Sequence, residues 1–357
     1  MKAATDPMRI LRMLFWETTI RCNLACVHCR RIESNEAAGA DLTTAEAQSL
    51  IEQLAELGRR QGQPPVLVFS GGEPLCRAEL FDLMASARQQ GIIVALATNG
   101  TLIDSDKAQQ IHDSGIARVS VSLDGADAAT HDQMRQIPGA FERAIEGVRH
   151  LRECGVAFQI NATLTRQNAR QLGQVYELAQ SLGSVALHIF MLVPVGCGQV
   201  LAATDMLSPS EYEQTLRRIH TLEGQGPMQI RVTCGPHYER VKRQMRNEYP
   251  VANPQSKGCL AGLGVLFVNH RGDVYPCGYL PLYCGNILQT TLAQIWDENK
   301  DLARVRDTEA LEGKCGRCGY KRICGGCRAR AFGTSGDYMA EEPFCAYIPS
   351  NARGTGG

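Results

Sequence analysis

The chain has 357 residues, which is long for one compact domain, so we expect two domains. Lysine plus arginine and aspartate plus glutamate number 37 each, so the net charge is zero and neither nucleic acid nor an acidic membrane surface is expected as a partner. The sequence has no apolar run of the roughly 20 residues that a membrane span needs and no signal peptide, which predicts a cytoplasmic protein.

Short apolar segments alternate with amphipathic segments in the first half of the chain. After a short leader, expected over residues 1–10, the pattern predicts strands at 11–19, 66–70, 92–97, 118–123, 157–163 and 185–192 and helices at 43–57, 78–90, 105–114, 140–153 and 169–182. Thr43 and Glu46 match a capping box at the first helix. Such βα units form a parallel sheet, and six of them fit an α/β fold, a partial (β/α)6 TIM-like barrel over residues 11–215. In such folds the chemistry takes place at the carboxyl ends of the strands.

A group of cysteines follows the first predicted strand: Cys22, Cys26 and Cys29, spaced C-x3-C-x2-C. Fifteen cysteines in a cytosolic chain indicate metal binding rather than disulfides. A cubane iron–sulfur cluster normally takes four thiolates, so a group of three leaves one iron open, as a catalytic metal centre requires. Zinc would need His28 as a fourth ligand, strained between its neighbours Val27 and Cys29.

Glycines and polar residues follow the next strands in turn. After the second strand, Gly71 and Gly72 allow close backbone approach, and Glu73 can accept a hydrogen bond from an ammonium group. Each fragment alone is common in loops, but their order at successive strand ends makes chance an unsatisfactory explanation. The residues that we expect to bind a cofactor here are Gly71, Gly72, Glu73, Pro74, Asn99, Ser122, Asp124, Asn161 and Arg166.

The C-x3-C-x2-C spacing and the Gly-Gly-Glu-Pro string resemble those of the radical SAM family. The resemblance implies that Cys22, Cys26 and Cys29 hold a [4Fe–4S] cluster whose open iron binds S-adenosyl-L-methionine, and that the strand-end residues contact this cofactor. In that family, one electron from the cluster cleaves S-adenosylmethionine to methionine and a 5′-deoxyadenosyl radical. The electron implies a low-potential donor such as ferredoxin or flavodoxin as a partner.

The rest of the chain is expected to form a connecting region over residues 216–258 and a small cysteine-rich domain over residues 259–357. Segments 264–269 and 273–275 predict a hairpin. The cysteines of this domain are Cys259, Cys277, Cys284, Cys315, Cys318, Cys324, Cys327 and Cys345. Their C-x2-C pairs are also compatible with a zinc ribbon. We expect four further cysteines to be free thiols: Cys76, Cys154, Cys197 and Cys234.

This second pattern resembles the SPASM extension of radical SAM enzymes, which holds auxiliary iron–sulfur clusters beside the barrel. The resemblance implies one or two such clusters. One would be bound by Cys315, Cys318, Cys324 and Cys345. Another would be bound in part by Cys259, Cys277 and Cys327, with Cys284 as a possible but poorly matching fourth ligand. The family usually has three residues between the last two cysteines of the central run, whereas this chain has only Gly325 and Gly326.

Strings near both ends, residues 15–30 and 324–345, are similar to those of radical SAM enzymes of the siroheme-dependent haem pathways. The closest branch implies oxidative decarboxylation of both propionates of iron-coproporphyrin III to vinyl groups, which gives haem b. The leftover electron would leave through an auxiliary cluster. Because propionates favour arginine partners, we expect carboxylate contacts from among Arg30, Arg31, Arg328 and Arg330. No catalytic side chain is assigned.

Three other functions stay open. A sister enzyme of the haem pathways would act on a siroheme derivative. A SPASM peptide or protein maturase would use the same two domains on a small partner. An iron–sulfur electron carrier needs no pocket for S-adenosylmethionine, so the Gly-Gly-Glu-Pro string argues against that function.

Overall fold

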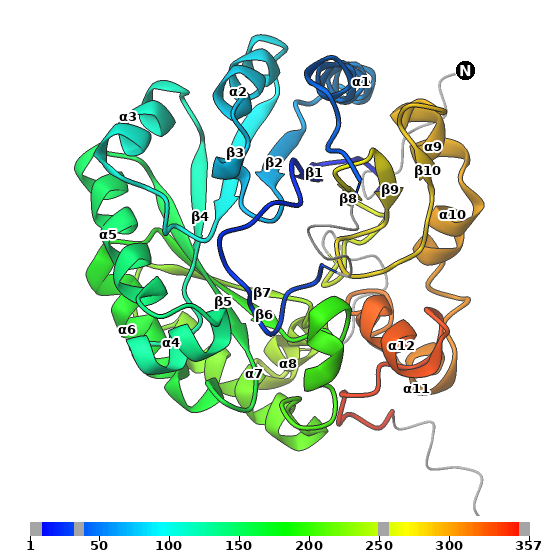
Figure 1. Ribbon diagram of the computed structural model, residues 1–357. Coiled ribbons are helices and arrows are strands. Elements are labelled where there is room, and N and C mark those ends of the chain that lie inside the picture. Colours follow the sequence, from blue (N-terminus) through cyan, green and yellow to red (C-terminus); the bar gives the residue numbers. More distant parts are fainter. Residues whose placement is uncertain (1–8, 32–38, 249–256, 350–357) are drawn as a thin grey trace, which may run out of the picture.

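One sheet of ten strands runs through the part of the chain that the computed structural model describes, residues 9–31, 39–248 and 257–349 (Figure 1). The strands are β1 (Met13–Glu17), β2 (Val66–Ser70), β3 (Ile93–Thr98), β4 (Arg118–Ser122), β5 (Phe158–Leu164), β6 (Ala186–Met191), β7 (Gln229–Thr233), β8 (Val265–Val268), β9 (Asp273–Tyr275) and β10 (Gly285–Asn286). Their order in space is β10-β9-β8-β1-β2-β3-β4-β5-β6-β7. All pairs from β8–β1 to β6–β7 are parallel, so the carboxyl ends of these strands lie at one edge. This arrangement confirms the predicted partial barrel.

Helices connect the strands and surround the curved sheet (Figure 1). They are α1 (Thr44–Gln61), α2 (Leu80–Gln89), α3 (Ser105–Asp113), α4 (Ala128–Arg135), α5 (Ala140–Glu153), α6 (Leu172–Leu182), α7 (Pro209–Glu223), α8 (Tyr238–Met245), α9 (Leu292–Glu298), α10 (Lys300–Arg306), α11 (Gly313–Gly316) and α12 (Arg328–Ser335). The capping box predicted at α1 is confirmed, because Glu46 N donates to Thr43 Oγ1 and Thr43 N donates to Glu46 Oε2. Among the described residues, no helix is both long and apolar enough to cross a membrane.

Two elements of the barrel are absent from the sequence prediction. Helix α4 lies between β4 and α5, and β7 extends the parallel sheet beyond β6, inside the region expected to be a connection. Strand β7 is an edge strand in which Ile230 is buried while Gln229 and Arg231 are exposed, so its apolar signal is weak. Most of the expected leader, residues 1–8, and the last part of the expected C-terminal domain, residues 350–357, lie outside the described residues.

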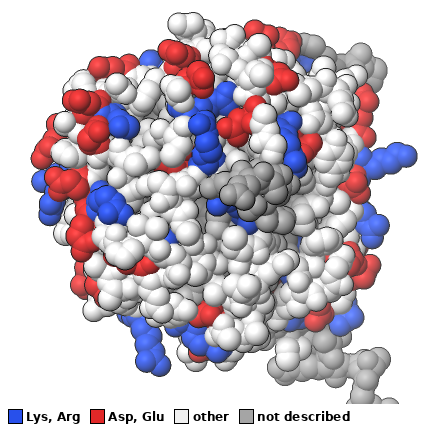
Figure 2. Space-filling model, in the orientation of Figure 1, with Lys and Arg blue, Asp and Glu red and all other residues white. Residues whose placement is uncertain are grey.

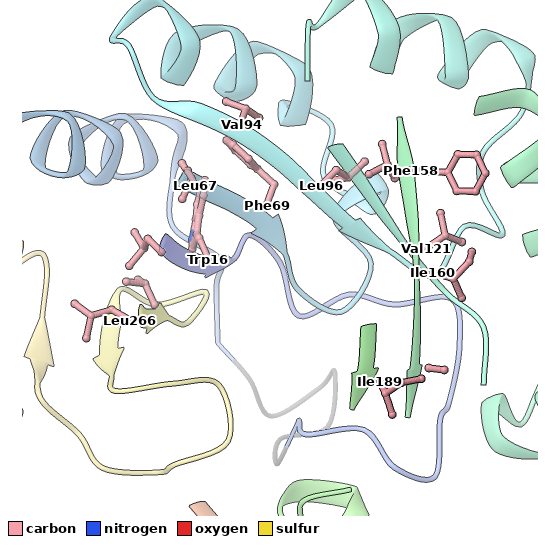
Figure 3. Close-up of a cluster of buried hydrophobic side chains, with 14 of the residues drawn as sticks. Trp16, Leu67, Phe69, Val94, Leu96, Val121, Phe158, Ile160, Ile189 and Leu266 are labelled. Atoms are coloured by element: carbon pink, nitrogen blue, oxygen red, sulfur yellow. The ribbon is translucent and has the colours of Figure 1, made fainter. Parts of the chain in front are cut away.

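The main apolar core lies between the sheet and the helices that cover it. Figure 3 shows buried side chains from neighbouring strands meeting in this core, with Trp16 of β1 beside Leu67 and Phe69 of β2. The rings of Trp16 and Phe69 lie 5.6 Å apart. Each fully buried aliphatic or aromatic side chain of this kind contributes about 1.5–3 kcal/mol of hydrophobic stabilisation. The strand ends, where the polar residues lie, are therefore held on a rigid support.

The C-terminal part of the chain continues the same sheet. The predicted hairpin is confirmed, since β8 and β9 pair in an antiparallel manner. Strand β8 also pairs in parallel with β1, with Met13–Trp16 opposite Val265–Val268. The cysteine-rich segment is thereby joined to the barrel through backbone hydrogen bonds.

A buried ion pair makes a second junction between the barrel and the C-terminal segment. Arg330 of α12 is fully buried, and its Nε donates to Glu342 Oε1 over 2.9 Å. The same guanidinium donates to Leu192 O, just after β6, over 3.3 Å and to Cys234 O, just after β7, over 2.5 Å. Glu342 in turn accepts from Cys327 N over 2.7 Å. The pair therefore fixes the ends of two barrel strands relative to the cysteine-rich segment.

Replacing Arg330 by alanine is expected to destabilise the protein by about 3–5 kcal/mol, because Glu342 would be left as a buried charge without its partner. The measurement is the urea midpoint and slope of anaerobic unfolding. Arg322→Ala is the matched control, since Arg322 pairs with Glu309 at the surface, where such pairs contribute about 0–1 kcal/mol. Equal losses in the two variants would contradict the structural role of the buried pair.

Candidate functional site

The loop after β1 carries Cys22, Cys26 and Cys29 and runs across the carboxyl-end edge of the sheet (Figure 1). Val27 N donates to Met134 O over 3.0 Å, which fastens the loop to the end of α4. The three thiols lie close together: burial raises the pKa of Cys22 to about 11, and negative charge at Cys26 and Cys29 contributes to this shift. These thiols must therefore release protons when they bind a metal at neutral pH.

The Gly-Gly-Glu-Pro string packs against the backbone that leads into this loop. Gly72 N donates to Thr19 O over 2.8 Å, and Glu73 N donates to Arg21 O over 2.8 Å. A Cβ atom on Gly72 would lie 2.3 Å from Arg21 O, and one on Gly71 would lie 2.5 Å from Thr19 O. Only glycine fits this close approach, which sets the position of the residues directly before Cys22.

Glu73 is completely buried, and its carboxylate is hydrogen-bonded to the end of β3. Its carboxylate accepts from Thr98 Oγ1 over 2.7 Å and from Asn99 N over 2.8 Å. Burial raises the pKa of Glu73 to about 6, although these hydrogen bonds act against the shift. Asn99 Nδ2 donates to Asn23 Oδ1 over 2.9 Å and so reaches the cysteine loop. Glu73 and Asn99, both expected to bind the cofactor, thus also position the cysteine loop.

Asp124 was expected to meet the cofactor, but the structure places its side chain in a buried ion pair. Its Oδ2 lies 2.6 Å from Arg135 Nη2 and 3.2 Å from His28 Nε2. Burial would raise the pKa of Asp124, but Arg135 and His28 outweigh it and lower the pKa. Burial also lowers the pKa of His28 to about 4, so the imidazole is neutral at neutral pH. Arg135 Nη1 in turn lies 3.5 Å from Cys26 Sγ, so Asp124 acts on the cysteine loop through Arg135.

The other predicted cofactor contacts are divided between two regions. Ser122 and Asn161 are half-buried and lie opposite each other on β4 and β5, at the carboxyl-end edge. Pro74 is buried and begins a short turn of helix after Glu73. Arg166 is exposed and lies 3.4 Å from Glu211 at the start of α7, so its guanidinium contacts α7 and not the cysteine loop.

In the C-terminal segment, one predicted group of cysteines surrounds a small hollow. The cysteines that line it are Cys315, Cys318, Cys324 and Cys345. Arg240 of α8 also lines the hollow, with its Nη2 3.9 Å from Cys345 Sγ. The structure therefore brings together the four cysteines that sequence resemblance assigned to one auxiliary cluster.

The second predicted group comprises Cys259, Cys277 and Cys327. Burial raises the pKa of Cys277 to about 12, and negative charge at the other two contributes to the shift, so the three thiols lie near one another. Cys284 is not among them: it is buried in the main core, where its thiol donates to Leu282 O over 3.4 Å. Cys234, expected to be a free thiol, forms a hydrogen bond with the thiol of Cys327.

Arg328 lies near both groups of cysteines. Among the described residues, no group of three His, Cys, Asp or Glu side chains could hold one metal ion. Arg328 acts electrostatically on both Cys259 and Cys315, and its Nε and Nη2 are buried without a hydrogen-bond partner in the described part of the chain. These donors suit the sulfur atoms of a cluster.

Tyr279 and Arg30 lie between the first cysteine loop and the cysteines of the C-terminal segment. Burial raises the pKa of Tyr279, and the charges that act on it include Cys29 of the first loop and Cys277 of the C-terminal segment. The guanidinium of Arg30 lies 4.2 Å from the ring centre of Phe267, and its side chain keeps 20% of its surface exposed. This region lies between the first cysteine loop and the C-terminal cysteines.

All four arginines expected to bind carboxylates have partners inside the protein. Arg30 Nη1 lies 3.3 Å from Oε1 of the buried Glu17. Arg330 belongs to the buried pair with Glu342, and Arg328 donates to the carbonyl oxygens of Tyr338 and Ala340. Arg31 donates to Ile20 O. Figure 2 shows side chains of both charge signs spread over this side of the molecule, in agreement with the balanced composition.

Three site residues lie outside the sequence prediction: Asn23, Arg135 and Cys234. Arg135 ends α4, and the signal for that helix is Asp127, whose side chain caps it by accepting from Thr130 N over 2.8 Å. Asn23 lies inside the cysteine motif, where loop residues carry no spacing signal. Cys234 is distant in sequence from the other cysteines, and only the fold brings it to Cys327.

Comparisons with known proteins agree with this geometry. Residues 16–179 match the radical SAM superfamily, and residues 259–319 match SPASM, an iron–sulfur cluster-binding domain. The chain is 42% identical to the AdoMet-dependent heme synthase of Methanosarcina barkeri, over 95% of this chain and 97% of that protein. It is 41% identical to the AdoMet-dependent heme synthase of Nitratidesulfovibrio vulgaris, over 95% and 93%. It is 33% identical to the pre-heme d1 synthase of Dinoroseobacter shibae, over 98% and 90%.

Solved structures share the fold at low sequence identity. SuiB of Streptococcus suis bound to its precursor peptide SuiA has a TM-score of 0.76 and 17% identity, over 95% of this chain and 76% of that one. The protein anSMEcpe with bound AdoMet has a TM-score of 0.71 and 20% identity, over 93% of both chains. These likenesses support the combined architecture of barrel and C-terminal segment.

Replacing Gly72 by alanine is expected to lower the stability by about 1–3 kcal/mol and to reduce iron binding at the first three cysteines, because the new Cβ forces Arg21 O away. The measurements are urea unfolding and iron per chain after anaerobic reconstitution. Gly224→Ala is the control, since a Cβ there would lie 3.9 Å from the nearest atom. Normal iron content in Gly72→Ala would show that the close approach does not position the cysteine loop.

Proposed function

Because the chain belongs to the radical SAM enzymes that carry a C-terminal SPASM domain and are related to haem synthesis, we propose that it converts iron-coproporphyrin III to haem b. The observation that carries the proposal is the 42% identity to an AdoMet-dependent heme synthase over 95% of this chain. The reaction is the oxidative decarboxylation of two propionate side chains to vinyl groups.

Each propionate loses one hydrogen atom, one carbon dioxide and one electron. A hydrogen atom leaves the β-carbon, the bond to the carboxylate carbon breaks, and carbon dioxide and one electron depart as the vinyl group forms. The cluster and S-adenosylmethionine, when bound, supply the 5′-deoxyadenosyl radical that takes the hydrogen atom. One electron per side chain is left for an acceptor.

The residues of this chain bind and orient the reacting groups. Cys22, Cys26 and Cys29 would hold the first cluster, and the Gly-Gly-Glu-Pro backbone would fix both the loop and S-adenosylmethionine. Arg135 places positive charge beside Cys26, which favours the thiolate form that ligation needs. Auxiliary iron–sulfur clusters would be held by the two groups of cysteines in the C-terminal segment.

Substrate binding is assigned to the region around Arg30 and Tyr279, between the first cysteine loop and the C-terminal cysteines. The Arg30 guanidinium pairs through Nη1 with Glu17, so Nε and Nη2 are the donors that would bind a propionate carboxylate. Stacking on Phe267 holds the plane of Arg30 in a defined orientation. We assign the reducing electron to a low-potential donor such as ferredoxin or flavodoxin, and the free-cysteine content supports a reducing, cytoplasmic location.

A second candidate substrate is a siroheme derivative. The supporting observation is the 33% identity to a pre-heme d1 synthase over 98% of this chain. The lower identity places this candidate second. Both reactions would start from the same radical and differ in the tetrapyrrole side chain that faces it.

The reconstituted protein, incubated anaerobically with dithionite, S-adenosylmethionine and iron-coproporphyrin III, is expected to form the one- and two-vinyl products together with 5′-deoxyadenosine, read by mass spectrometry. Cys26→Ala is expected to abolish all three, whereas Cys154→Ala, at the end of α5, should retain them. Deoxyadenosine without a porphyrin product would reject the proposed substrate. Turnover by Cys26→Ala would reject the radical mechanism.

Replacing Arg30 by alanine is expected to raise the KM for iron-coproporphyrin III about 10- to 150-fold, the equivalent of the roughly 1.5–3 kcal/mol of a charge-assisted hydrogen bond. Iron content should stay normal. Arg30→Lys should rescue only partly, because lysine keeps the charge but not the planar fork. Arg60→Ala, at a surface pair with Asp297, is the control. An unchanged KM in Arg30→Ala would remove Arg30 from the substrate site.

A further inference from the structure

Cys234 lies just after β7, in the barrel, yet its thiol faces the cysteines of the C-terminal segment. It is hydrogen-bonded to the thiol of Cys327, and both Cys234 and Cys277 pack against the small buried cluster of side chains that contains Cys327. Cys259 interacts electrostatically with both Cys277 and Cys327. Thiols from four separate parts of the chain therefore form one group.

The backbone of Cys234 is held in a conformation that suits glycine. Its φ angle is +57°, and among the non-glycine residues in the described ranges only Gln136 and Asn247 also have positive φ. Such a conformation is unfavourable for a residue with a side chain and is retained where the surroundings enforce it. Here Arg330 Nη2 and Tyr212 Oη both donate to Cys234 O, over 2.5 and 3.2 Å. These two hydrogen bonds hold Cys234 in this conformation.

We infer that Cys234 is the fourth cysteine ligand of an auxiliary iron–sulfur cluster whose other ligands are Cys259, Cys277 and Cys327. On ligation each thiol releases its proton to solvent, and each sulfur binds one iron. Such a cluster has no iron open to an external ligand, which is the coordination of a structural or electron-transfer centre and not of a substrate-binding one.

A cubane cluster normally takes four cysteine ligands, and the C-terminal segment supplies only three of them to this group: Cys259, Cys277 and Cys327. Cys284, the alternative in that segment, is buried in the main core among apolar side chains. The fourth ligand comes instead from the barrel, so the cluster would link β7 to the C-terminal segment. The inference rests on the iron–sulfur part of the proposed function and not on the identity of the substrate.

The test uses Cys234→Gly, which removes the thiol and relieves the strained φ angle, so the variant is expected to fold. After anaerobic reconstitution it should contain about four fewer irons per chain than the wild type, or show the electron paramagnetic resonance signal of a three-iron cluster. Cys284→Ala should keep the wild-type iron content. The far-ultraviolet circular dichroism should be unchanged in Cys234→Gly.

Three comparisons separate the outcomes. Cys327→Ser should lose as much iron as Cys234→Gly, and the double variant should lose no more than either, because both residues bind one cluster. Cys234→Ser, which keeps the size of the side chain, should show the same loss. Wild-type iron and spectra in Cys234→Gly, together with a loss in Cys327→Ser, would overturn the assignment of Cys234. Wild-type iron in both would overturn the cluster itself, whatever the substrate assay shows.

Discussion

The ion pair between Arg330 and Glu342 joins the barrel to the cysteine-rich segment at a point where neither side chain reaches water. Removing two charges from water costs several kcal/mol each, so the pair is useful only if its remaining donors and acceptors are satisfied. They are: Arg330 donates to carbonyl groups after β6 and β7, and Glu342 accepts from Cys327 N. Arg330 lowers the pKa of Glu342 to about 2 despite burial. The contribution of this carboxylate is therefore complete above its ordinary pKa and is lost only as the pH falls towards 2.

Two buried carboxylates near the first cysteines act in different ways because their neighbours differ. Glu73 has neutral hydrogen-bond donors, so burial dominates and its pKa rises to about 6. Asp124 has Arg135 beside it, so the ionised form is favoured and its pKa falls. The negative charge of Asp124 holds the guanidinium that lies next to Cys26. Thus Glu73 fixes the shape of the loop, and Asp124 sets the electrostatic environment of its thiols.

Much of the barrel could be predicted because its strands are apolar and its helices amphipathic. The predicted bounds of β2 and α5 agree with the structure, and the four cysteines that resemblance assigns to one cluster line one hollow. Strand β7 was missed because an edge strand with one exposed face carries little apolar signal. The burial of Asp124 depends on Arg135, which lies on a helix that the prediction lacked. The position of Cys234 could not be predicted from spacing, since β7, Arg330 and Tyr212 together place it.

The pairing of β1 with both β2 and β8 has a consequence for synthesis on the ribosome. One edge of β1 meets β2 early, but the other edge has no partner until Val268 has been synthesised, which is residue 268 of 357. Until then the nascent barrel presents an unpaired strand edge with the apolar residues Leu14 and Trp16 beside it. The late pairing of β1 with β8 thus leaves a strand edge of the kind that favours aggregation unpaired for most of the synthesis of the chain.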